Sequence, residues 1–260
     1  MRLSRRVALG GNQLDEVHER IVIRGVDTGS AKESVQAVSR MGGSGQRVTT
    51  RHFETLDVVV TLAIDLPKRE LAARREAWEA VCAWALAGGW LEVSYLPDRR
   101  MWVDLVILPG GGDLWKWTED FQITFRAYAV PFWQDAEPQS VGVRGVSSWS
   151  GAIGNPGHYE SVADATFRNT SGQAMTSFSI TVGGNTISLS GFSLAAGADL
   201  VISHGTDGLL RITAGGVSIY DKRSADSADD LYVAPGTAAI SMTAGTTGTL
   251  TVSVDGRYAG

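Results

Sequence analysis

The sequence predicts an α+β domain followed by an all-β sandwich. One amphipathic helical segment lies among strand-like segments in the first half of the 260-residue chain, which is typical of α+β domains. The second half alternates short strand-like segments with glycine-rich turns, which favours a β-sandwich. Seven of the eight tryptophans lie at or before Trp133, whereas residues 138–260 hold only six of the 23 lysines and arginines. The composition changes near residue 138, and we expect domains at 1–137 and 138–260.

Alternating apolar residues indicate the strands of the first domain. Segment Leu56–Ile64 is the clearest case, because every second residue is Leu, Val or Ile and shares one face. Segment Asp120–Val130 alternates in the same way. The predicted strands are Arg20–Val26, Leu56–Ile64, Leu91–Leu96, Met101–Leu108 and Asp120–Val130.

One amphipathic helix is predicted over Pro67–Ala87. Pro67 suits the first helical position, and the glycines at 88–89 end the helix. We expect two i,i+4 charge pairs on the outer face: Glu70 with Arg74, and Arg75 with Glu79. We expect the helix to cover one face of a sheet through Leu71, Trp78, Val81, Cys82 and Ala85.

The segment 27–50 is polar, rich in glycine and serine, and has no sustained hydrophobic period. It is long for a loop inside a compact domain, and such loops are usually functional or disordered. Its apolar residues are spaced by three and have little of their own domain to bury against, so we expect a neighbouring subunit to cover them. Its arginines are expected to pair with acidic residues there. The alternative is a disordered loop. The predicted contacts of this intersubunit arm are Val35, Val38, Arg40, Met41, Arg47 and Arg51.

Short strands with turn signals between them fill the second domain, and no helical period interrupts them. Glycine-containing turns recur at 170–172, 183–185, 206–208, 214–216 and 234–236. The predicted strands are Val141–Trp149, Val162–Asn169, Phe178–Val182, Thr186–Leu189, Leu200–Ser203, Leu209–Thr213, Val217–Tyr220, Ala239–Thr243 and Leu250–Val254.

Motifs for cofactors and metals are absent from the sequence. The glycine clusters at 42–45 and 110–112 lack the Lys-Ser/Thr of a P-loop and the spacing of a dinucleotide fingerprint. His18, His52, His158 and His204 are scattered, so we expect surface histidines that are solvated or hydrogen-bonded. Cys82 lies among apolar residues and is expected to be a small buried hydrophobe. We expect no cofactor and no metal site.

Few enzymatic alternatives remain. A Ser/His/Asp triad stays open, because its members lie far apart along a chain. Glu92 and Asp104 are candidates to face each other across the hairpin 91–108 as paired carboxylates, although exposed strand acids are the commoner interpretation. We expect a protein that is not an enzyme.

Charge and hydropathy exclude two classes of partner. A net charge of −5 offers no basic footprint for nucleic acid. No apolar run approaches the roughly 20 residues that cross a bilayer. The first eleven residues lack the apolar core of a signal peptide. We therefore expect neither a nucleic-acid nor a membrane partner.

A series of short motifs runs along nearly the whole chain. In the first half these are the loop closing at Gly42-Gly-Ser-Gly-Gln-Arg-Val48, the strand 56–64, the helix from Pro67, the hairpin around 97–100 and the exit Ala129-Val-Pro-Phe-Trp133. In the second half they are Ile153-Gly-Asn-Pro-Gly157, Ala163–Ser171, Val182-Gly-Gly-Asn-Thr-Ile187, Asp199-Leu-Val-Ile202, Leu231-Tyr-Val-Ala-Pro-Gly236 and Leu250–Tyr258. In order and spacing they resemble the distal tail proteins of long, non-contractile-tailed bacteriophages and related prophages.

This resemblance implies a structural virion protein of the tail-tip or baseplate hub, made in the host cytoplasm and placed at the distal end of the tail. It implies that the N-terminal domains form a hexameric ring, while galectin-like C-terminal sandwiches project outward. The ring would join the tail tube protein to the tail-tip hub protein, and receptor-binding proteins are further expected partners.

Two features depart from the family pattern. The exit reads Pro-Phe-Trp, where many members carry an acidic residue before a proline and an aromatic residue. The sandwich is short and has no inserted sugar-binding module, which lowers the expectation of direct host adhesion. The alternative function is a carbohydrate-binding module for host-surface adhesion, because serine- and threonine-rich sandwiches are common among lectins. Its aromatic platform would come from Trp149, Tyr159, Phe192, Tyr220, Tyr232 and Tyr258.

Overall fold

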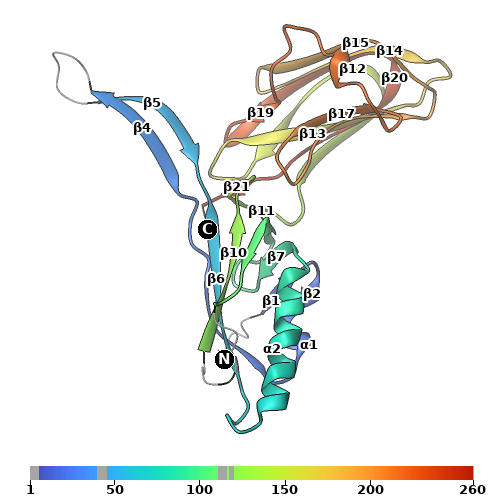
Figure 1. Ribbon diagram of the computed structural model, residues 1–260. Helices are drawn as coiled ribbons and strands as arrows, with labels where there is room; N and C mark the ends of the chain where they lie inside the picture. Colours follow the sequence, from blue (N-terminus) through green and yellow to red (C-terminus); the bar gives the residue numbers. More distant parts are fainter. Residues whose placement is uncertain (1–5, 40–45, 111–115, 117–119, 260) are drawn as a thin grey trace. The chain divides into compact units, whose positions relative to one another are not determined.

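The computed structural model describes residues 6–39, 46–110, 116 and 120–259. Contacts divide the chain into two compact units between Trp133 and Gln134, and Ala259 groups with the first unit. The division lies close to residue 137, where the composition changes. Figure 1 shows the helices in the first unit and a body of strands in the second.

The first unit contains a four-stranded antiparallel sheet of order β3-β6-β10-β9, a second sheet that begins β2-β1-β7-β8, and a separate hairpin of β4 and β5. The elements are β1 (Val7–Leu9), β2 (Asn12–Gln13), α1 (Leu14–Val17), β3 (Ile21–Asp27), β4 (Glu33–Ser39), β5 (Gln46–Phe53), β6 (Leu56–Ile64), α2 (Leu71–Leu86), β7 (Gly89–Val93), β8 (Arg99–Val103), β9 (Leu105–Ile107) and β10 (Asp120–Ala127). The short strand β11 (Trp133–Asp135) lies at the boundary between the units.

Helix α2 covers one face of the four-stranded sheet. Alternate residues of β6 and β10 are buried and face each other in register, as Phe125 does with Val58. Trp78 of α2 lies edge-on against Phe121, and Trp84 lies edge-on against Phe125, with ring centroids 4.8 and 5.8 Å apart. The predicted packing of the helix on a sheet and the bounds Leu56–Ile64 are therefore confirmed.

The helix differs from its prediction at its first turn. It begins at Leu71, because residues 67–70 form a turn in which Glu70 N–H donates to the Pro67 carbonyl. Leu71 is exposed, so its predicted place on the buried face is wrong. Arg74 is 2% exposed and donates to the carbonyls of Ile64 and Leu66 at 3.3 and 2.6 Å, so the predicted outer pair Glu70–Arg74 is also wrong. The other predicted pair, Arg75–Glu79, is confirmed at 2.7 Å.

Two further elements of the first unit differ from the prediction. The expected strand 101–108 is divided at Asp104, so that β8 pairs with β7 in one sheet and β9 pairs with β10 in the other. Asp104 holds the chain between the two sheets. Its backbone N–H donates to the carbonyl of Arg126, and its carboxylate accepts from the backbone N–H groups of Tyr128 and Ala129. The prediction of a single helix is also wrong, since α1 forms over four residues, too few to show a hydrophobic period.

The second unit is the expected β-sandwich, and its strands form one continuous sheet that folds over on itself. The sheet order is β15-β14-β20-β13-β16-β17-β18, with β12 paired to β20 and β19 to β13. The elements are β12 (Gln139–Asn155), β13 (Ser161–Asn169), β14 (Met175–Val182), β15 (Asn185–Leu194), β16 (Asp199–His204), β17 (Leu210–Ala214), β18 (Val217–Ser218), the 3-10 turn η1 (Tyr220–Lys222), β19 (Tyr232–Val233), β20 (Gly236–Val254) and β21 (Arg257–Tyr258).

Strand β20 takes part in both layers of the sandwich. Its first part pairs with β14, and its second part, from Gly248 on, pairs with β13. The prediction of two strands, 239–243 and 250–254, is wrong, because glycines at 245 and 248 carry the strand between layers and resemble a turn in sequence. A Cβ at Gly248 would overlap the Phe167 ring, so only glycine fits this crossing. The predicted strand 217–220 is likewise shorter, ending at Ser218 before η1.

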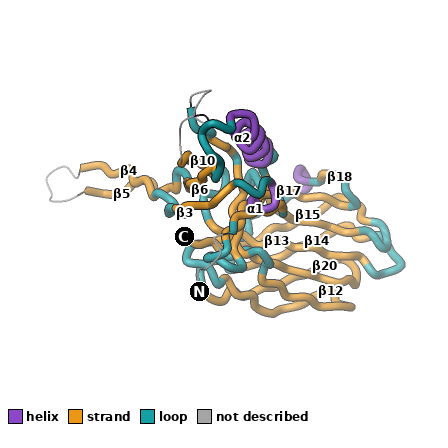
Figure 2. The backbone as a smooth tube through the Cα atoms, turned by 90° about the horizontal axis from the view of Figure 1, so that it is seen from below, coloured by secondary structure: helices purple, strands orange, loops and turns teal. Residues whose placement is uncertain are grey.

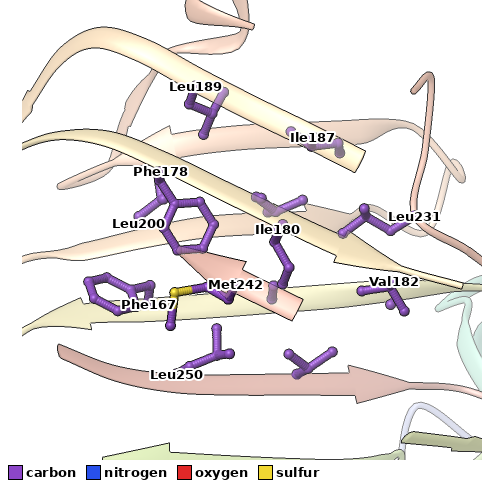
Figure 3. Packing of buried hydrophobic residues seen from close by; sticks show 14 of the residues in the cluster. Phe167, Phe178, Ile180, Val182, Ile187, Leu189, Leu200, Leu231, Met242 and Leu250 are labelled. Carbon is purple, nitrogen blue, oxygen red and sulfur yellow. The ribbon is translucent and has the colours of Figure 1, made fainter. Parts of the chain in front are cut away.

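Apolar side chains from both layers fill the sandwich. Figure 3 shows Phe167 of β13, Phe178 and Ile180 of β14, and Met242 and Leu250 of β20 in one cluster. Phe167 and Phe178 lie with ring centroids 5.4 Å apart. Side chains from both inner faces thus form one core, as in a sandwich of two packed layers.

The buried guanidinium of Arg74 is expected to stabilise the first unit. Replacing it by alanine in Arg74→Ala leaves two buried carbonyls with fewer donors and a cavity, which should lower the free energy of unfolding by about 2–4 kcal/mol. The matched control is Arg75→Ala, which removes the same side chain from the exposed face and should cost below about 0.5 kcal/mol. Urea unfolding followed by tryptophan fluorescence measures both, and equal losses would contradict the role given to Arg74.

Candidate intersubunit arm and neighbouring surfaces

Strands β4 (Glu33–Ser39) and β5 (Gln46–Phe53) form a hairpin that extends from the first unit. Strands β4 and β5 pair antiparallel from Glu33 opposite Phe53 to Ser39 opposite Gln46, with a bulge after Gln36. They make a two-stranded sheet of their own. Figure 1 shows this hairpin projecting beyond the ends of β3 and β6 instead of folding back onto α2.

The root of the hairpin is held by several local contacts. Lys32 N–H donates to the Thr55 carbonyl, and Glu54 N–H donates to the Lys32 carbonyl at 2.9 Å. Gly29 has a φ of +52°, and a Cβ there would meet the Asp57 carbonyl, so the chain leaves β3 at a position that requires glycine. Phe53 lies edge-on against Phe132 with ring centroids 4.8 Å apart. These contacts hold the base of the hairpin where the chain leaves β3 and enters β6.

An ion pair fixes the sheet directly beside this root. Asp57 and Arg126 face each other across β6 and β10, and the guanidinium binds both carboxylate oxygens at 2.5 and 2.7 Å. Hydrogen bonding from Arg126 holds the pKa of Asp57 below its usual value, against the opposing effect of burial. Arg126 also donates to the Tyr128 hydroxyl at 3.3 Å. This bidentate pair holds β6 against β10 where the arm leaves the sheet.

The structure locates part of the predicted arm. Val35 lies on β4 and is 47% exposed. In backbone register, Val35 is opposite Arg51 and Val38 is opposite Arg47. Arg40 and Met41 lie outside the described residues. The segment is not the irregular loop that its composition predicts. Ser34 and Gln36 alternate with Val35 and Ala37, but this period of two covers only four residues of β4, and the bulge opposite it adds Thr49 to β5.

Among the described residues, no further strand joins the β4–β5 hairpin, and its two faces have no second layer of their own sheet. An isolated hairpin is at best marginally stable in water, and three strands or a packed partner are normally needed. Here the solvent-exposed residues of β4 include an apolar one, Val35. The intersubunit role of the arm therefore remains our prediction, and the hairpin geometry gives it a physical reason.

A second apolar surface lies on β9 at the edge of the four-stranded sheet. Leu105 and Ile107 are 41% and 40% exposed and lie on the face opposite α2. Tyr128, just after β10, is 47% exposed. Among the described residues β9 pairs with β10 alone. We call Leu105, Ile107 and Tyr128 the edge patch, and such a free edge with apolar side chains favours a protein partner.

The residues considered for catalysis do not come together. Glu92 is opposite Arg100 in the β7–β8 register, so Glu92 and Asp104, the alternative considered as paired carboxylates, do not face each other across this hairpin. Cys82 is half-buried, and burial followed by the charge of Glu79 raises the pKa of its thiol. A raised pKa disfavours the nucleophilic thiolate, in agreement with a packing role.

His204 is the exception among the histidines, because its side chain is only 8% exposed. Its two ring nitrogens lie 2.7 Å from Asp164 and 2.7 Å from Asp230. Burial disfavours the charged ring, but the two carboxylates outweigh burial and raise the pKa of His204 to about 9. With both nitrogens engaged, the imidazole acts as a cationic link between β13, β16 and the segment before β19. Sequence reasoning missed it, because Asp164 and Asp230 are distant in the chain.

The described residues contain no cluster of His, Cys, Asp and Glu able to hold a metal ion. Among these same residues, no helix is long and apolar enough to cross a membrane.

The aromatic residues considered for sugar binding are spread over different surroundings. Phe192 and Tyr258 are buried, whereas Tyr220 and Tyr232 are 47% and 39% exposed. A hollow of about 240 Å³ lies on the outer face of β14, β15 and β20, and the residues lining it are Ser177, Phe178, Ser179, Ser188, Leu189, Thr243, Ala244 and Gly245. None of the six aromatic residues expected to form the platform lines this hollow, and its one aromatic residue, Phe178, is buried in the core.

Three solved structures are similar to this chain over nearly its whole length. The SPP1 Dit protein, described as a paradigm of the hub adsorption apparatus in phages that infect Gram-positive bacteria, has 12% identity and a TM-score of 0.66, covering 96% of this chain and 98% of its own. A chain of the phage P2 baseplate in its activated conformation with Ca has 9% identity, a TM-score of 0.50 and coverages of 97% and 98%. A chain of the same baseplate with Sr has 9% identity and a TM-score of 0.51, and the match covers 96% of this chain and 97% of its own.

No protein-family model matches the sequence, and no curated protein matches it either. At identities of 9–12%, the comparisons show a shared fold. The expected architecture, an α+β unit followed by a sandwich as in a phage Dit protein, is therefore confirmed at the level of the fold.

The link through His204 makes stability depend on pH. Because its folded pKa of about 9 exceeds the ordinary value of 6.5, this stabilisation is complete below pH 6.5 and is lost as the pH rises through 9. The side chain of Asp164 is 41% exposed, and solvent there weakens its interaction with His204. We therefore expect the link to contribute about 2 kcal/mol to the free energy of unfolding. His204→Gln should therefore destabilise the sandwich at pH 6 and much less at pH 10 in urea unfolding. The control His158→Gln removes an exposed imidazole, and an equal effect there would contradict the assignment.

Shortening the arm should disrupt assembly without unfolding the subunit. Ser34 and His52 are opposite each other, so an Asn-Gly turn can join them in place of residues 35–51 while the root contacts remain. We expect an unchanged circular dichroism spectrum apart from the lost strands, together with a lower molar mass by light scattering. A shortened variant that assembles like the native chain would show that the hairpin makes no essential contact.

A point substitution tests the same arm more gently. Burying Val35 against a neighbour should contribute about 1–2 kcal/mol per interface, which Val35→Glu would remove. The matched control is Val217→Glu, since Val217 is also exposed on a short strand but lies in the sandwich. Light scattering should show weaker assembly for the first variant alone, and equal effects would speak against the arm.

Proposed function

We propose that this chain is a structural protein of a phage virion that assembles into a hexameric ring at the distal end of the tail. The observation that carries the proposal is the uncovered β4–β5 hairpin, whose faces need a partner. A cyclic arrangement supplies one, because each arm contacts the next copy and every contact is equivalent around a closed ring. The similarity of fold to phage hub and baseplate proteins supports the same function.

The edge patch supports a ring built from the first units. Leu105, Ile107 and Tyr128 lie on the side of the sheet away from α2, in the same unit as the arm. A neighbour that covers this edge would supply the missing hydrogen-bond partners of β9. Two distinct contact surfaces on one unit are what heterologous contacts require, since each copy presents one surface to each neighbour.

In this proposal the ring is a connector. One side contacts the tail tube protein and the other contacts the tail-tip hub protein, while the sandwiches are available to receptor-binding proteins. The chain acts through binding surfaces and catalyses no reaction. Its synthesis in the host cytoplasm precedes incorporation into the virion.

The molar mass of the native chain tests the ring. Six copies of 27.7 kDa give about 166 kDa, which light scattering distinguishes from a monomer. A chain that stays monomeric at high concentration is next mixed with the tail tube protein, which is the surface expected to template the ring. A monomer under both conditions, or a closed oligomer of a different mass, contradicts the hexamer.

A further inference from the structure

Within the sandwich, the described residues leave one long strand without a pairing strand on its outer side. β12 is paired with β20 over Gln139–Asn155 and, among the described residues, with no other strand. In Figure 2, β12 lies at the rim of the sandwich beside β20, and β14 follows further inside. Its outward backbone N–H and C=O groups are therefore free to pair with another strand.

The other edge strands of the same sheet are either covered, as β15 is, or only two residues long, as β18 and β19 are. The edge of β15 is covered by the segment 224–228, in which Ser224 N–H donates to the Ser188 carbonyl at 2.9 Å and Ala228 N–H donates to the Thr186 carbonyl at 2.8 Å. At the opposite end β18 has only two residues. Covering an edge and shortening it are two ways by which proteins prevent strand addition, and β12 uses neither.

The composition of β12 also leaves it open. Arg144 is its sole charged residue, and the strand contains no proline. Two register shifts lie between Arg144 and Ser148 and divide the strand into two straight parts. The second part, Ser148–Gly154, is uncharged, and we call it the open segment.

Trp149 lies within the open segment at the margin of the core. It is partly exposed and packs against the apolar cluster. Its ring occupies the space that a Cβ at Gly151 would need, so glycine there is required to seat the tryptophan. A partly exposed tryptophan beside a free backbone edge is the composition found at binding hot spots.

The outer face of the sheet carries two rows of hydroxyl groups that end on the open segment. Direct cross-strand partners share a face of the sheet. One row consists of Ser150, Ser241, Thr181 and Thr186 on β12, β20, β14 and β15, and the other consists of Ser148, Thr243, Ser179 and Ser188. Within these rows the hydroxyls of Thr181 and Thr186 lie 2.8 Å apart, and those of Ser179 and Ser188 lie 2.9 Å apart.

We propose that the open segment of β12 binds an extended strand of a different polypeptide by adding it to the sheet. The edge supplies backbone hydrogen bonds, and the two faces specify the side chains. The added strand needs small polar residues on the outer face, where it continues the hydroxyl rows. It needs apolar residues on the inner face, where it contacts Trp149. This proposal goes beyond the ring, because it concerns the sandwich and a partner of another sequence.

A second copy of this chain fits the edge less well. An antiparallel pair of two β12 strands centred on their middles would place the register shifts at 144–148 against each other and interrupt the ladder there. A shorter strand avoids them by pairing with the open segment alone. Arg144 is exposed four residues before the open segment, beyond the register shifts. A partner strand that pairs with the open segment and extends past Ser148 toward this guanidinium is expected to carry an acidic residue at that end.

The probe is a fluorescein-labelled peptide of about ten residues that alternates valine with threonine or serine and has one terminal glutamate, long enough to pair with a strand edge. Fluorescence anisotropy measures its binding to the full chain. Ser150→Lys places a charge on the edge and should weaken binding about tenfold or more. The matched control is Ser241→Lys, which makes the same change on the same face one strand further inside and should weaken binding less than about threefold. Hydrogen exchange should show protection of residues 148–154 by the peptide.

Arg144→Glu should weaken binding of the peptide that carries glutamate and leave binding of a version with glutamine in its place unchanged. Three results would overturn the proposal: no binding to the full chain, equal weakening by both lysine variants, or protection confined to other strands. A fall in the molar mass of the protein alone on Ser150→Lys would also overturn it, because a second copy would then occupy the edge. These results do not depend on hexamer formation, which the mass of the native chain measures separately.

Discussion

The central physical constraint in this chain is that a β-sheet must cover its apolar faces and its edges, and the β4–β5 hairpin covers neither by itself. The four-stranded sheet buries one face under α2 through the pairs Trp78–Phe121 and Trp84–Phe125. The second unit buries its inner faces by folding one long sheet into two layers. The hairpin has no such layer, and two strands alone are marginally stable in water. We therefore propose that its partner is a neighbouring copy of the chain, as in the proposed ring.

The hairpin is coupled to the core at its root. Gly29 turns the chain out of β3, Phe53 packs on Phe132, and the Asp57–Arg126 pair joins β6 to β10 beside them. Because these contacts join the root to the sheet, a partner that binds the hairpin would also constrain the orientation of the four-stranded sheet. In a ring this coupling would link the position of one copy to that of the next. The two surfaces of this first unit, arm and edge patch, would then act together.

The sequence predicted those features that depend on local patterns. Leu56–Ile64 alternates without interruption, and the predicted bounds agree with the structure. Features that depend on distant partners were missed. Arg74 looked like an outer-face residue, yet the carbonyls of Ile64 and Leu66 draw it inward. His204 looked isolated, yet its carboxylate partners come from residues 164 and 230. Short or interrupted patterns hid other elements, because the alternation of β4 covers only residues 34–37, and glycines within β20 resemble a turn. The candidate arm was found by its composition, while its form as a hairpin required knowledge of backbone pairing.

Three-dimensional reconstruction of the assembled chain by electron microscopy tests the central claim most directly, since it shows both symmetry and the partner of the hairpin. The account predicts a closed particle with six-fold symmetry, in which each β4–β5 hairpin lies against an adjacent copy. A particle of another symmetry would contradict the hexamer. A six-fold particle whose hairpins contact only solvent or their own subunit would contradict the role of the arm.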